Sequence, residues 1–419
     1  MNLIGGERSE SGATAAGPRA RFDRTAPRLA APILDDLMVE DAASARDGDG
    51  APRRPALRLV TARPLRVVDV AMWYGERSGG IRTYLDAKTA FAQRTGAFEH
   101  RLVVPGIVRK VTDHTCSLPS IRVANSNGYR WPIGTRPLVD LLRELDPDVV
   151  LLHDPFWAPR AVQSIGVPVV MVHHGSLDLD ANAIPGPTRV YRPALGRWLR
   201  RAYAGADAVM SACDPHPDTG RGATMPLRFG LDTAFYPEGD EQRGDHVLYA
   251  GRIGREKGVF ELLEAAALSR EPWPLWLMGT GSAAKVVDAQ IRRLGLGDRV
   301  RLVPYERDRD ALASAYRSAR CVVMPGELET FGLVAFEAAA SGAATVACSN
   351  APSASLLGDL VHTFHPGDPR ALLDAVERAR AAEPDRLTAA RFAAANRWER
   401  AFAAELADLE HVVAQRRAV

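Results

Sequence analysis

The chain has 419 residues, which is too long for one ordinary hydrophobic core and predicts two domains. Hydrophobic residues make up 46% and charged residues 25%, as in a typical globular protein, and the net charge of +2 gives no electrostatic support for a nucleic-acid partner. The sequence shows no membrane-length apolar run, no secretory leader and no CxxC pair among its four cysteines, which predicts a cytoplasmic protein without a zinc site.

The first stretch, residues 1–63, is rich in Ala, Arg, Asp, Gly and Pro. Segments such as "ARDGDGAPRRPA" hold too few apolar side chains to form a core, so we predict a disordered extension. One short piece, "APILDDLMVE" (Ala31 to Glu40), is apolar enough to dock on the rest of the protein.

A first domain is predicted over residues 64–236, where short apolar strands alternate with helical patterns. The strands are "LRVVDVAMW", "HRLVVPG", "VVLLHD", "VPVVMVHH" and "DAVMS", and the helices include "GGIRTYLDAKTAFAQ" and "RPLVDLLRELDPD". This alternation favours a parallel sheet covered by helices on both faces.

A polar, turn-rich linker, residues 237–246, leads into a second domain over residues 246–396. The same alternation returns there, with strands "HVLYAGR", "PLWLMGTGS", "VRLVPYE", "CVVMPG" and "ATVACS". The sequence therefore predicts an α/β protein with two facing doubly wound, Rossmann-like domains. Ligands of such sheets bind beyond the carboxyl ends of the strands, so we expect a ligand cleft between the domains.

The C-terminal segment, residues 397–419, carries an apolar stripe at helical spacing. The stripe consists of Trp398, Phe402, Leu406, Leu409 and Val413. Such a helix either packs on the second domain or crosses back to the first, and the spacing does not separate these two.

Two loops after strands of the second domain suggest an anion site. In "GRIGREKG", Arg252 and Lys257 lie just before a helix, where free amides and two cations suit a diphosphate; the alternative is a solvated basic loop. In "MGTGS", Gly279 allows a ligand to approach the backbone, although a tight turn explains it as well.

The segment "GELETFGLVAFEAAASG" places Glu329 in a loop and Glu337 inside the helix that begins at Gly332. Two carboxylates this far apart do not share a proton, but each accepts hydroxyl donors, as sugar diols require. The alternative is one acid favoured by the helix dipole and a second on a solvated face.

These motifs together resemble family 4 of the retaining glycosyltransferases, which have the GT-B fold and an E-x7-E motif. "GRIGREKG" and "GELETFGLVAFEAAASG" carry the likeness, supported by "GGIRTYL", "HD", "MVHHGS" and "LRFGLDTAFYP", over about residues 65–415. The resemblance implies donor binding in the second domain, acceptor binding mainly in the first, and a final helix that crosses back.

Roles for individual residues follow from the resemblance alone. It implies that Arg252 and Lys257 hold the donor diphosphate and stabilise the leaving group, that Glu329 contacts the sugar, and that Glu337 contacts the ribose. His174 would lie near the reacting sugar, with His173 as the alternative. The other implied donor-binding residues are Gly79, Gly80, Gly279, Phe331, Gly332 and Leu333.

Several segments depart from the family pattern or leave alternatives open. "NAPSASLLGD" replaces a glycine-rich turn and a further acid, which puts the donor sugar in doubt. Arg77 and Arg82 either bind an acceptor phosphate or form surface salt bridges. The DxD patterns at Asp146–Asp148 and Asp178–Asp180 are not interpreted as metal ligands, and the first is typical of a helix-to-strand turn.

A basic helix is predicted over residues 192–206. Its Arg197, Arg200 and Arg201 beside Trp198 and Tyr203 fit an anionic membrane surface, or a solvated basic face over a packed Trp.

The sequence thus predicts a metal-independent, retaining hexosyltransferase without a cofactor. Its donor is GDP-mannose or a UDP-hexose, with a slight preference for mannose from the resemblance, and its acceptor is a glycan, a lipid or a small molecule. Two rivals remain: a nucleotide-sugar epimerase of the same architecture, and a non-catalytic subunit that keeps the fold. The second is disfavoured because both cations and both acids are present.

Overall fold

The computed structural model describes residues 63–75, 79–123, 129–175, 188–212 and 223–418. Several features predicted from the sequence therefore lie outside the described residues. They are the N-terminal extension with its Ala31 to Glu40 segment, Arg77, Cys213 and the second DxD pattern at Asp178 and Asp180.

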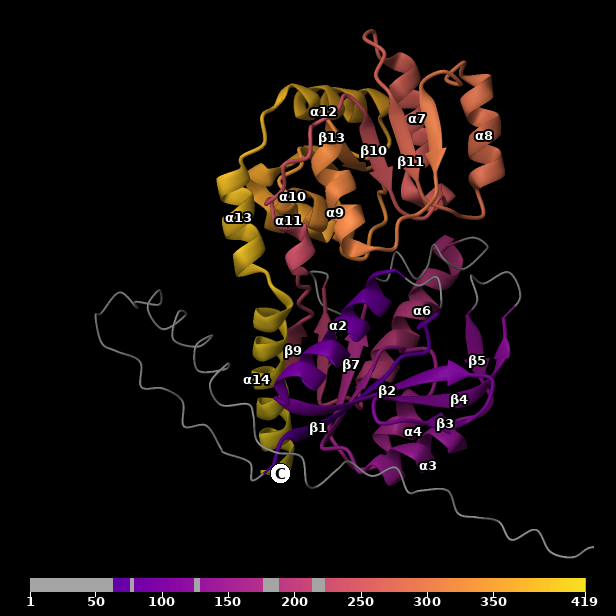
Figure 1. The fold of residues 1–419 in the computed structure, drawn as a ribbon. Coiled ribbons are helices and arrows are strands. Elements are labelled where there is room, and N and C mark those ends of the chain that lie inside the picture. The colour runs from indigo at the N-terminus through magenta and orange to yellow at the C-terminus, as the bar shows by residue number, and fades with distance from the viewer. Residues whose placement is uncertain (1–62, 76–78, 124–128, 176–187, 213–222, 419) are drawn as a thin grey trace, which may run out of the picture.

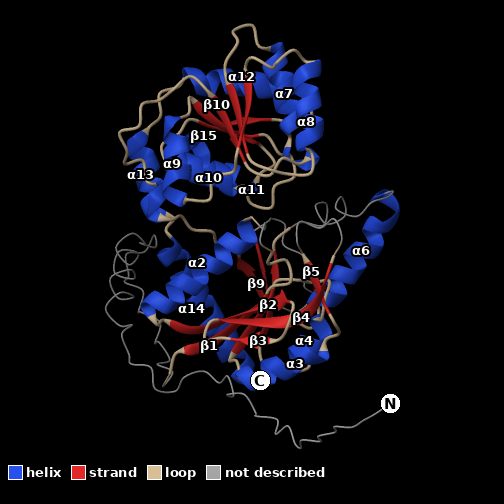
Figure 2. Cartoon of the chain, turned by 45° about the vertical axis from the view of Figure 1, so that its right-hand side comes forward, coloured by secondary structure: helices blue, strands red, loops and turns tan. Residues whose placement is uncertain are grey.

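The described chain forms two α/β domains, one above the other in Figure 1. The predicted fold class of two doubly wound, mainly parallel sheets is confirmed. Helices, drawn blue in Figure 2, cover both faces of each red sheet.

The first domain is built on a nine-stranded sheet, counted over the described residues, in the order β3–β4–β2–β1–β6–β7–β8–β9 with β5 paired to β4. Its strands are β1 (Leu65–Val70), β2 (Phe98–Gly106), β3 (Lys110–Val111), β4 (Thr115–Arg122), β5 (Arg130–Pro132), β6 (Val149–Leu152), β7 (Val169–His173), β8 (Ala208–Ser211) and β9 (Ala223–Pro226). The predicted parallel sheet also has an antiparallel edge, where β3 and β5 pair antiparallel with β4.

The second domain contains a six-stranded parallel sheet in the order β12–β11–β10–β13–β14–β15. Its strands are β10 (Val247–Ala250), β11 (Leu275–Met278), β12 (Val300–Val303), β13 (Cys321–Met324), β14 (Thr345–Cys348) and β15 (Val361–Phe364). This is the Rossmann order, in which the strand sequence reverses direction between β10 and β13.

Helices fill the spaces between strands in both domains. They are α2 (Gly80–Thr95), α3 (Arg136–Leu145), α4 (Pro159–Gln163), α6 (Thr188–Tyr203), α7 (Val259–Leu268), α8 (Ala284–Arg293), α9 (Arg309–Ser318), α10 (Leu333–Ala340), α11 (Pro352–Leu357), α12 (Pro369–Ala381), α13 (Arg386–Ala395) and α14 (Trp398–Arg417). The described residues also form the short 3-10 helices η1 (Thr233–Phe235), η2 (Arg255–Lys257) and η3 (Gly358–Leu360).

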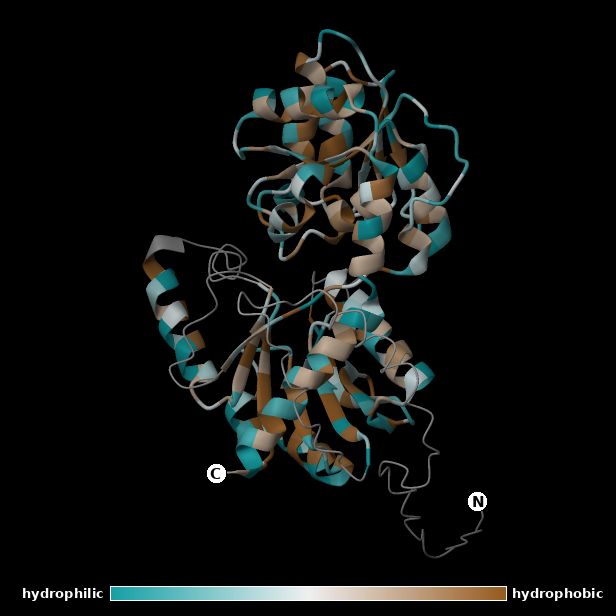
Figure 3. Cartoon of the chain, turned by 90° about the vertical axis from the view of Figure 1, so that its left-hand side faces the viewer, coloured by the Kyte–Doolittle hydropathy of each residue, from teal (hydrophilic) through white to brown (hydrophobic). Residues whose placement is uncertain are grey.

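Each sheet separates two hydrophobic cores. In β1, Val67 belongs to the core beneath α2 and α14, while its neighbour Val68 belongs to the core on the opposite face. In β10, Val247 and Leu248 divide in the same way. This alternation is the two-residue period of a strand buried on both faces, and the hydrophobic strands run through the interior in Figure 3.

The last helix, α14, lies along the first domain beside α2, as Figure 1 shows in yellow. Its Trp398 and Phe402 rings stack on each other with centroids 5.1 Å apart, and Phe402 also contacts Tyr84 and Phe91 of α2. The chain thus crosses between the domains twice. The two crossings touch where the Leu231 amide donates to the Asn396 carbonyl at 2.8 Å.

The topology places one switch point in each domain, where neighbouring parallel strands lead to helices on opposite faces. In the second domain this point lies between β10 and β13, and in the first it lies between β1 and β6. Loops that follow these four strands are the expected ligand-binding positions of the fold.

Candidate active site

At the switch point of the second domain, the loop after β10 contacts the loop after β13. A side chain on Gly258 would lie 2.5 Å from the carbonyl oxygen of Pro325, and Gly258 has a φ of +69°. Only glycine suits both the conformation and the space. The contact aligns the residue before Gly258, Lys257, with the loop that carries Glu329.

Lys257 and Glu329 form an ion pair across these two loops. The Lys257 Nζ atom lies 2.7 Å from Glu329 Oε2, and both side chains are largely buried. The sequence assigned them separately, to a phosphate and to a sugar. The fold brings them together, so one site offers a cation and a carboxylate side by side.

Arg252 lies on the same loop but is about half-exposed, and it pairs with Glu256 at 2.8 Å. The loop ends at the N-terminus of α7, where no side chain caps the first amides. Free helix amides near two cations form a positive environment suited to an anionic group.

Glu337 is buried within α10, which rules out the alternative of an acid on a solvated face. Its Oε1 accepts a hydrogen bond from Arg309 at 2.8 Å, and Arg309 also donates to Asp232 at 2.9 Å, just before η1. Burial raises the pKa of the Glu337 carboxyl, and the Arg309 charge opposes that shift. Arg309 therefore joins Glu337 to the segment that links the domains.

The glycines singled out in the sequence lie in different environments. A side chain on Gly279 would lie 1.8 Å from the Gly251 carbonyl oxygen, so Gly279 is needed for close packing of two loops. Gly332 has a φ of +97° at the start of α10. A side chain on Gly79 would meet nothing, whereas one on Gly80 would lie 3.1 Å from Leu333 of the other domain.

The start of α10 contacts the first domain directly. The ring of Phe331 stacks on Phe229 with centroids 4.3 Å apart, and Leu333 lies against Gly80 at the start of α2. The N-termini of α2 and α10 therefore meet, which brings the candidate residues of the two domains to a common region.

At the end of β7, one strand beyond the switch point of the first domain, the two adjacent histidines diverge. His173, the last residue of β7, faces the ring of Tyr203 in α6. His174 turns to the other side, where its Nε2 lies 2.7 Å from His153 Nδ1. Burial holds the pKa of His174 well below its usual range.

Among the other cations, Arg82 of α2 pairs with Asp86 at 3.2 Å, and its guanidinium lies over the Tyr74 ring. The surface salt bridge is thus formed at Arg82.

The first DxD pattern lies in a turn after α3, where Asp146 has a φ of 48°. Both of its carboxylates, Asp146 and Asp148, bind arginines of the first domain. In the described residues, no group of three or more His, Cys, Asp or Glu is placed to hold a metal ion.

Two family models match the chain, one on each domain. The model described as Glycosyltransferase Family 4 matches residues 78–215, and the one described as Glycosyl transferases group 1 matches residues 236–397, which include both loops of the second-domain site. The chain belongs to family 4 of the glycosyltransferases.

Curated relatives of this glycosyltransferase are bacterial enzymes. It is 28% identical over 379 residues to a GDP-mannose-dependent alpha-(1-6)-phosphatidylinositol dimannoside mannosyltransferase of Mycobacterium tuberculosis, covering 82% of this chain and 96% of that protein. It is 32% identical over 286 residues to a D-inositol 3-phosphate glycosyltransferase of Catenulispora acidiphila, covering 59% of this chain and 66% of the relative.

Solved structures of glycosyltransferases share the fold. Sucrose-phosphate synthase of Thermosynechococcus elongatus superposes with a TM-score of 0.60 at 21% identity, covering 84% of this chain and 97% of that one. An Escherichia coli trehalose-6-phosphate enzyme bound with UDP-2-fluoro glucose gives the same TM-score at 15% identity, covering 82% and 98%. The GT-B architecture of this glycosyltransferase is thereby confirmed.

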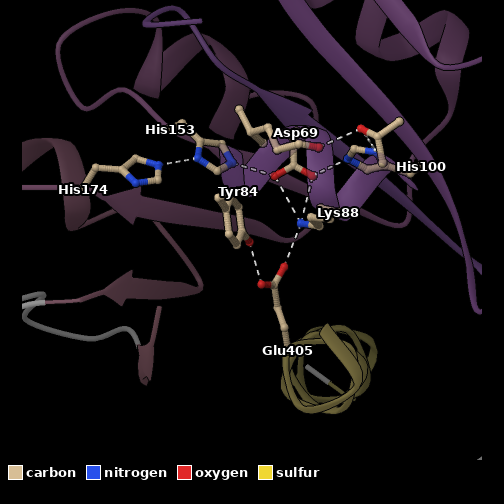
Figure 4. A network of polar contacts seen from close by, with 9 residues as sticks. Asp69, Tyr84, Lys88, His100, His153, His174 and Glu405 are labelled. Carbon is tan, nitrogen blue, oxygen red and sulfur yellow. Dashed lines mark hydrogen bonds and ion pairs between the residues drawn. The ribbon is translucent and has the colours of Figure 1, made fainter. Parts of the chain in front are cut away.

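The sequence reasoning missed a buried polar network beside His174, shown in Figure 4. Asp69 lies inside the apolar strand β1, and Lys88 lies on the buried face of α2. Both are fully buried, and the Lys88 Nζ atom lies 2.9 Å from Asp69 Oδ2. A single acid within "LRVVDV" and a single lysine on an apolar helix face were the signals that could have revealed them.

Proposed function

We propose that this glycosyltransferase transfers a hexose from a nucleotide sugar to an acceptor hydroxyl with retention of anomeric configuration. The observation that carries the proposal is the Lys257–Glu329 pair at the switch point of the second domain. A cation beside a carboxylate matches a donor whose anionic diphosphate adjoins a sugar rich in hydroxyls.

In this proposal Lys257, Arg252 and the N-terminus of α7 bind the diphosphate. They also stabilise the charge that develops on it as the bond to the anomeric carbon breaks. Glu329 accepts hydrogen bonds from the sugar hydroxyls. Glu337, oriented by Arg309, accepts them from the ribose.

The bond changes balance without a covalent enzyme intermediate. The bond between the anomeric carbon and the diphosphate oxygen breaks, and the acceptor oxygen bonds to the same face of that carbon. The acceptor proton passes to the departing phosphate oxygen, which is the nearest anion on that face. Because fixed cations supply the positive charge, the proposed reaction needs no metal ion.

The donor and the acceptor are inferred from the relatives. One relative is named for GDP-mannose and the other for an inositol phosphate, and the names of both refer to inositol. We favour GDP-mannose, keep UDP-hexoses as the second donor, and propose an inositol-containing phosphate or lipid among glycan, lipid and small-molecule acceptors.

A lipid acceptor would be reached at a membrane surface, and α6 supports such a contact. Figure 2 shows α6 projecting from the first domain. Its Arg197, Arg200 and Arg201 are exposed, and Trp198 is 38% exposed while stacking on Phe156. Basic side chains around a half-exposed Trp suit an anionic lipid surface.

No described helix has the length and apolar character needed to span a bilayer. The cytoplasmic location stays a prediction.

Two rivals predict different products. An epimerase of this fold would alter the sugar nucleotide without any acceptor, and a non-catalytic subunit would release nothing. We therefore propose measuring nucleoside diphosphate release from GDP-mannose and from UDP-hexoses, with and without an inositol phosphate acceptor. Acceptor-dependent release supports transfer, acceptor-independent change of the donor supports the epimerase, and no reaction with any donor contradicts the proposal.

A further inference from the structure

Three side chains from adjacent strands form a continuous hydrogen-bonded row that ends at His174 (Figure 4). Asp69 of β1 contacts His153, which follows β6, with its Oδ1 atom 2.6 Å from His153 Nε2. His153 Nδ1 in turn lies 2.7 Å from His174 Nε2, after β7. β1, β6 and β7 are neighbours in the sheet, so the row crosses the switch point of the first domain.

The charge on Asp69 determines which atom donates and which atom accepts in each hydrogen bond of this row. Burial alone would raise the pKa of Asp69, but the Lys88 charge and hydrogen bonds from His100 and His153 outweigh it and hold the pKa well below its usual range. An ionised carboxylate only accepts hydrogen bonds, so His153 Nε2 must carry a proton.

A neutral His153 then has an unprotonated Nδ1, which can only accept. The facing atom, His174 Nε2, must therefore donate, and in a neutral ring this leaves His174 Nδ1 without a proton. We propose that Asp69 and His153 are positioning residues that fix His174 in its Nε2–H tautomer, so that its Nδ1 accepts a hydrogen bond from a substrate hydroxyl. This inference rests on the proposed function for the nearness of His174 to the reacting sugar.

The rest of the network holds Asp69 in its ionised state. Lys88 bridges Asp69 and Glu405 of α14, with its Nζ atom 2.7 Å from Glu405 Oε1. Burial alone would lower the pKa of Lys88, but the two carboxylates outweigh it and raise the pKa. Tyr84 donates to Glu405 Oε2 at 2.5 Å, and its ring lies against both His153 and His174. The returning helix α14 thus supports the orientation of a residue at the switch point.

The chain offers a matched control for His153. His100 contacts the other oxygen of the same carboxylate, with its Nε2 atom 2.7 Å from Asp69 Oδ2, and it is buried to a similar degree. It has no contact with His174; its second nitrogen lies 3.1 Å from the Thr89 hydroxyl. Each of His153→Phe and His100→Phe removes one hydrogen bond from Asp69, but only the first disconnects His174.

The first measurement is the ring tautomer of His174 at pH 8, by nitrogen NMR of protein with labelled histidines and no ligand. The His174 signals are assigned by their loss in His174→Asn. We expect an unprotonated Nδ1 and a protonated Nε2 in the native protein and in His100→Phe, and a mixture of tautomers in His153→Phe. The opposite tautomer in the native protein would overturn the inference even if neither Phe variant folds.

The second measurement compares sugar transfer by the two variants. We expect His153→Phe to lower kcat about tenfold or more with donor KM little changed, because positioning partners typically matter to this extent. His100→Phe should keep kcat within about twofold. Equal kcat losses that follow equal losses of thermal stability would show a purely structural role.

The two measurements separate this inference from the proposed function. The tautomer is measured without a nucleotide sugar, so it can be as predicted in a protein that transfers nothing. In that case the proposed function fails and the ring arrangement stands. If His153→Phe transfers sugar at the normal rate and its His174 ring keeps the native tautomer, the inference is refuted and the proposed function stays intact.

Discussion

The Nζ atom of Lys257 lies 2.7 Å from Oε2 of Glu329, although 72 positions separate them in the chain. The cation proposed for the diphosphate thus neutralises the acid proposed for the sugar. A donor that binds here must take over both partners. Substitution of either residue therefore leaves the other without its ion-pair partner.

Lys257→Ala should weaken nucleoside diphosphate binding for two reasons. It removes a charge-assisted contact, about 1.5 to 3 kcal/mol or about 10- to 150-fold in affinity, and it leaves the Glu329 carboxylate unpaired beside the phosphates. Adding Glu329→Gln to this variant should restore part of the loss. Calorimetry with the diphosphate and with the bare nucleoside measures both effects.

Arg255→Ala is the matched control for this loop. Arg255 is exposed and lies over the Phe260 ring, so its loss should leave the affinity nearly unchanged. Arg252→Ala should resemble Lys257→Ala with a smaller loss, because Arg252 is more exposed. Equal losses for nucleoside and diphosphate would show that the loop does not bind the diphosphate.

Glu329→Ala and Glu337→Ala should fail in different ways. Glu329→Ala frees Lys257, so affinity for the nucleoside diphosphate should stay the same or rise, while kcat/KM with the intact donor falls. Glu337→Ala should weaken both ligands, because both contain the ribose. The comparison is each variant's diphosphate affinity against its kcat/KM with the full donor, and equal losses of diphosphate affinity would refute the division of roles.

Glu337→Ala also removes one of the two carboxylates that pair with Arg309, and Asp232 is the other. We expect the melting temperature to fall for Glu337→Ala and to recover in part for Glu337→Gln, which keeps an acceptor oxygen toward Arg309. Glu329→Gln is the comparison at the other acid of the motif.

The packing of α14 predicts a large stability effect at Phe402. This ring is 1% exposed and contacts Trp398, Tyr84 and Phe91, so Phe402→Ala should cost about 3 to 5 kcal/mol of unfolding free energy. His411→Ala, on the exposed side of the same helix, should cost little. Denaturant unfolding measures both, and similar small losses would contradict the packing of α14 on the first domain.

Stability should fall as the pH drops below about 6.5. Burial lowers the pKa of His100 and of His174, so the unfolded chain binds protons that the folded protein refuses, and unfolding becomes easier on acidification. Burial is the largest cause of the lowered pKa of His100, and Lys88 adds to it, while Asp69 and Glu405 oppose it without cancelling it.

The measurement is the melting temperature between pH 8 and pH 5. His100→Phe should be less stable at pH 8 but should lose less on acidification than the native protein. Asp69 adds a further loss at lower pH, because its depressed pKa gives stability that is present above the ordinary carboxyl pKa and lost below it. A melting temperature that is flat from pH 8 to pH 5 would contradict the burial of neutral histidines.

The sequence predicted most strands of the two sheets because they are short apolar runs, as in β6 and β13. It did not predict β3, β4, β5, β9 or β15. Of these, β3 and β5 are only two and three residues long, which is too short to show a period, and they are strands because β4 lies beside them. The Lys257 and Glu329 motifs were readable as loops after strands, but their pairing depends on the order of strands in the sheet.

The buried network was harder to predict for the same reason. Tyr84 and Glu405 are separated by 321 positions, and nothing local to either residue identifies the other. A buried charge is stable only with its partner, so its presence in an apolar run signals that a partner exists without naming it. The return of α14 to the first domain supplies that partner.

The central claim is that a hexose passes from a nucleotide sugar to an acceptor with its configuration kept. The most direct test is the anomeric configuration of the product, by NMR, after reaction with an α-linked donor and an inositol phosphate acceptor in excess EDTA. We expect an α-linked product, formed at the same rate as without EDTA and lost in Lys257→Ala but not in Arg255→Ala. A β-linked product, or turnover that EDTA abolishes and manganese restores, would contradict the account.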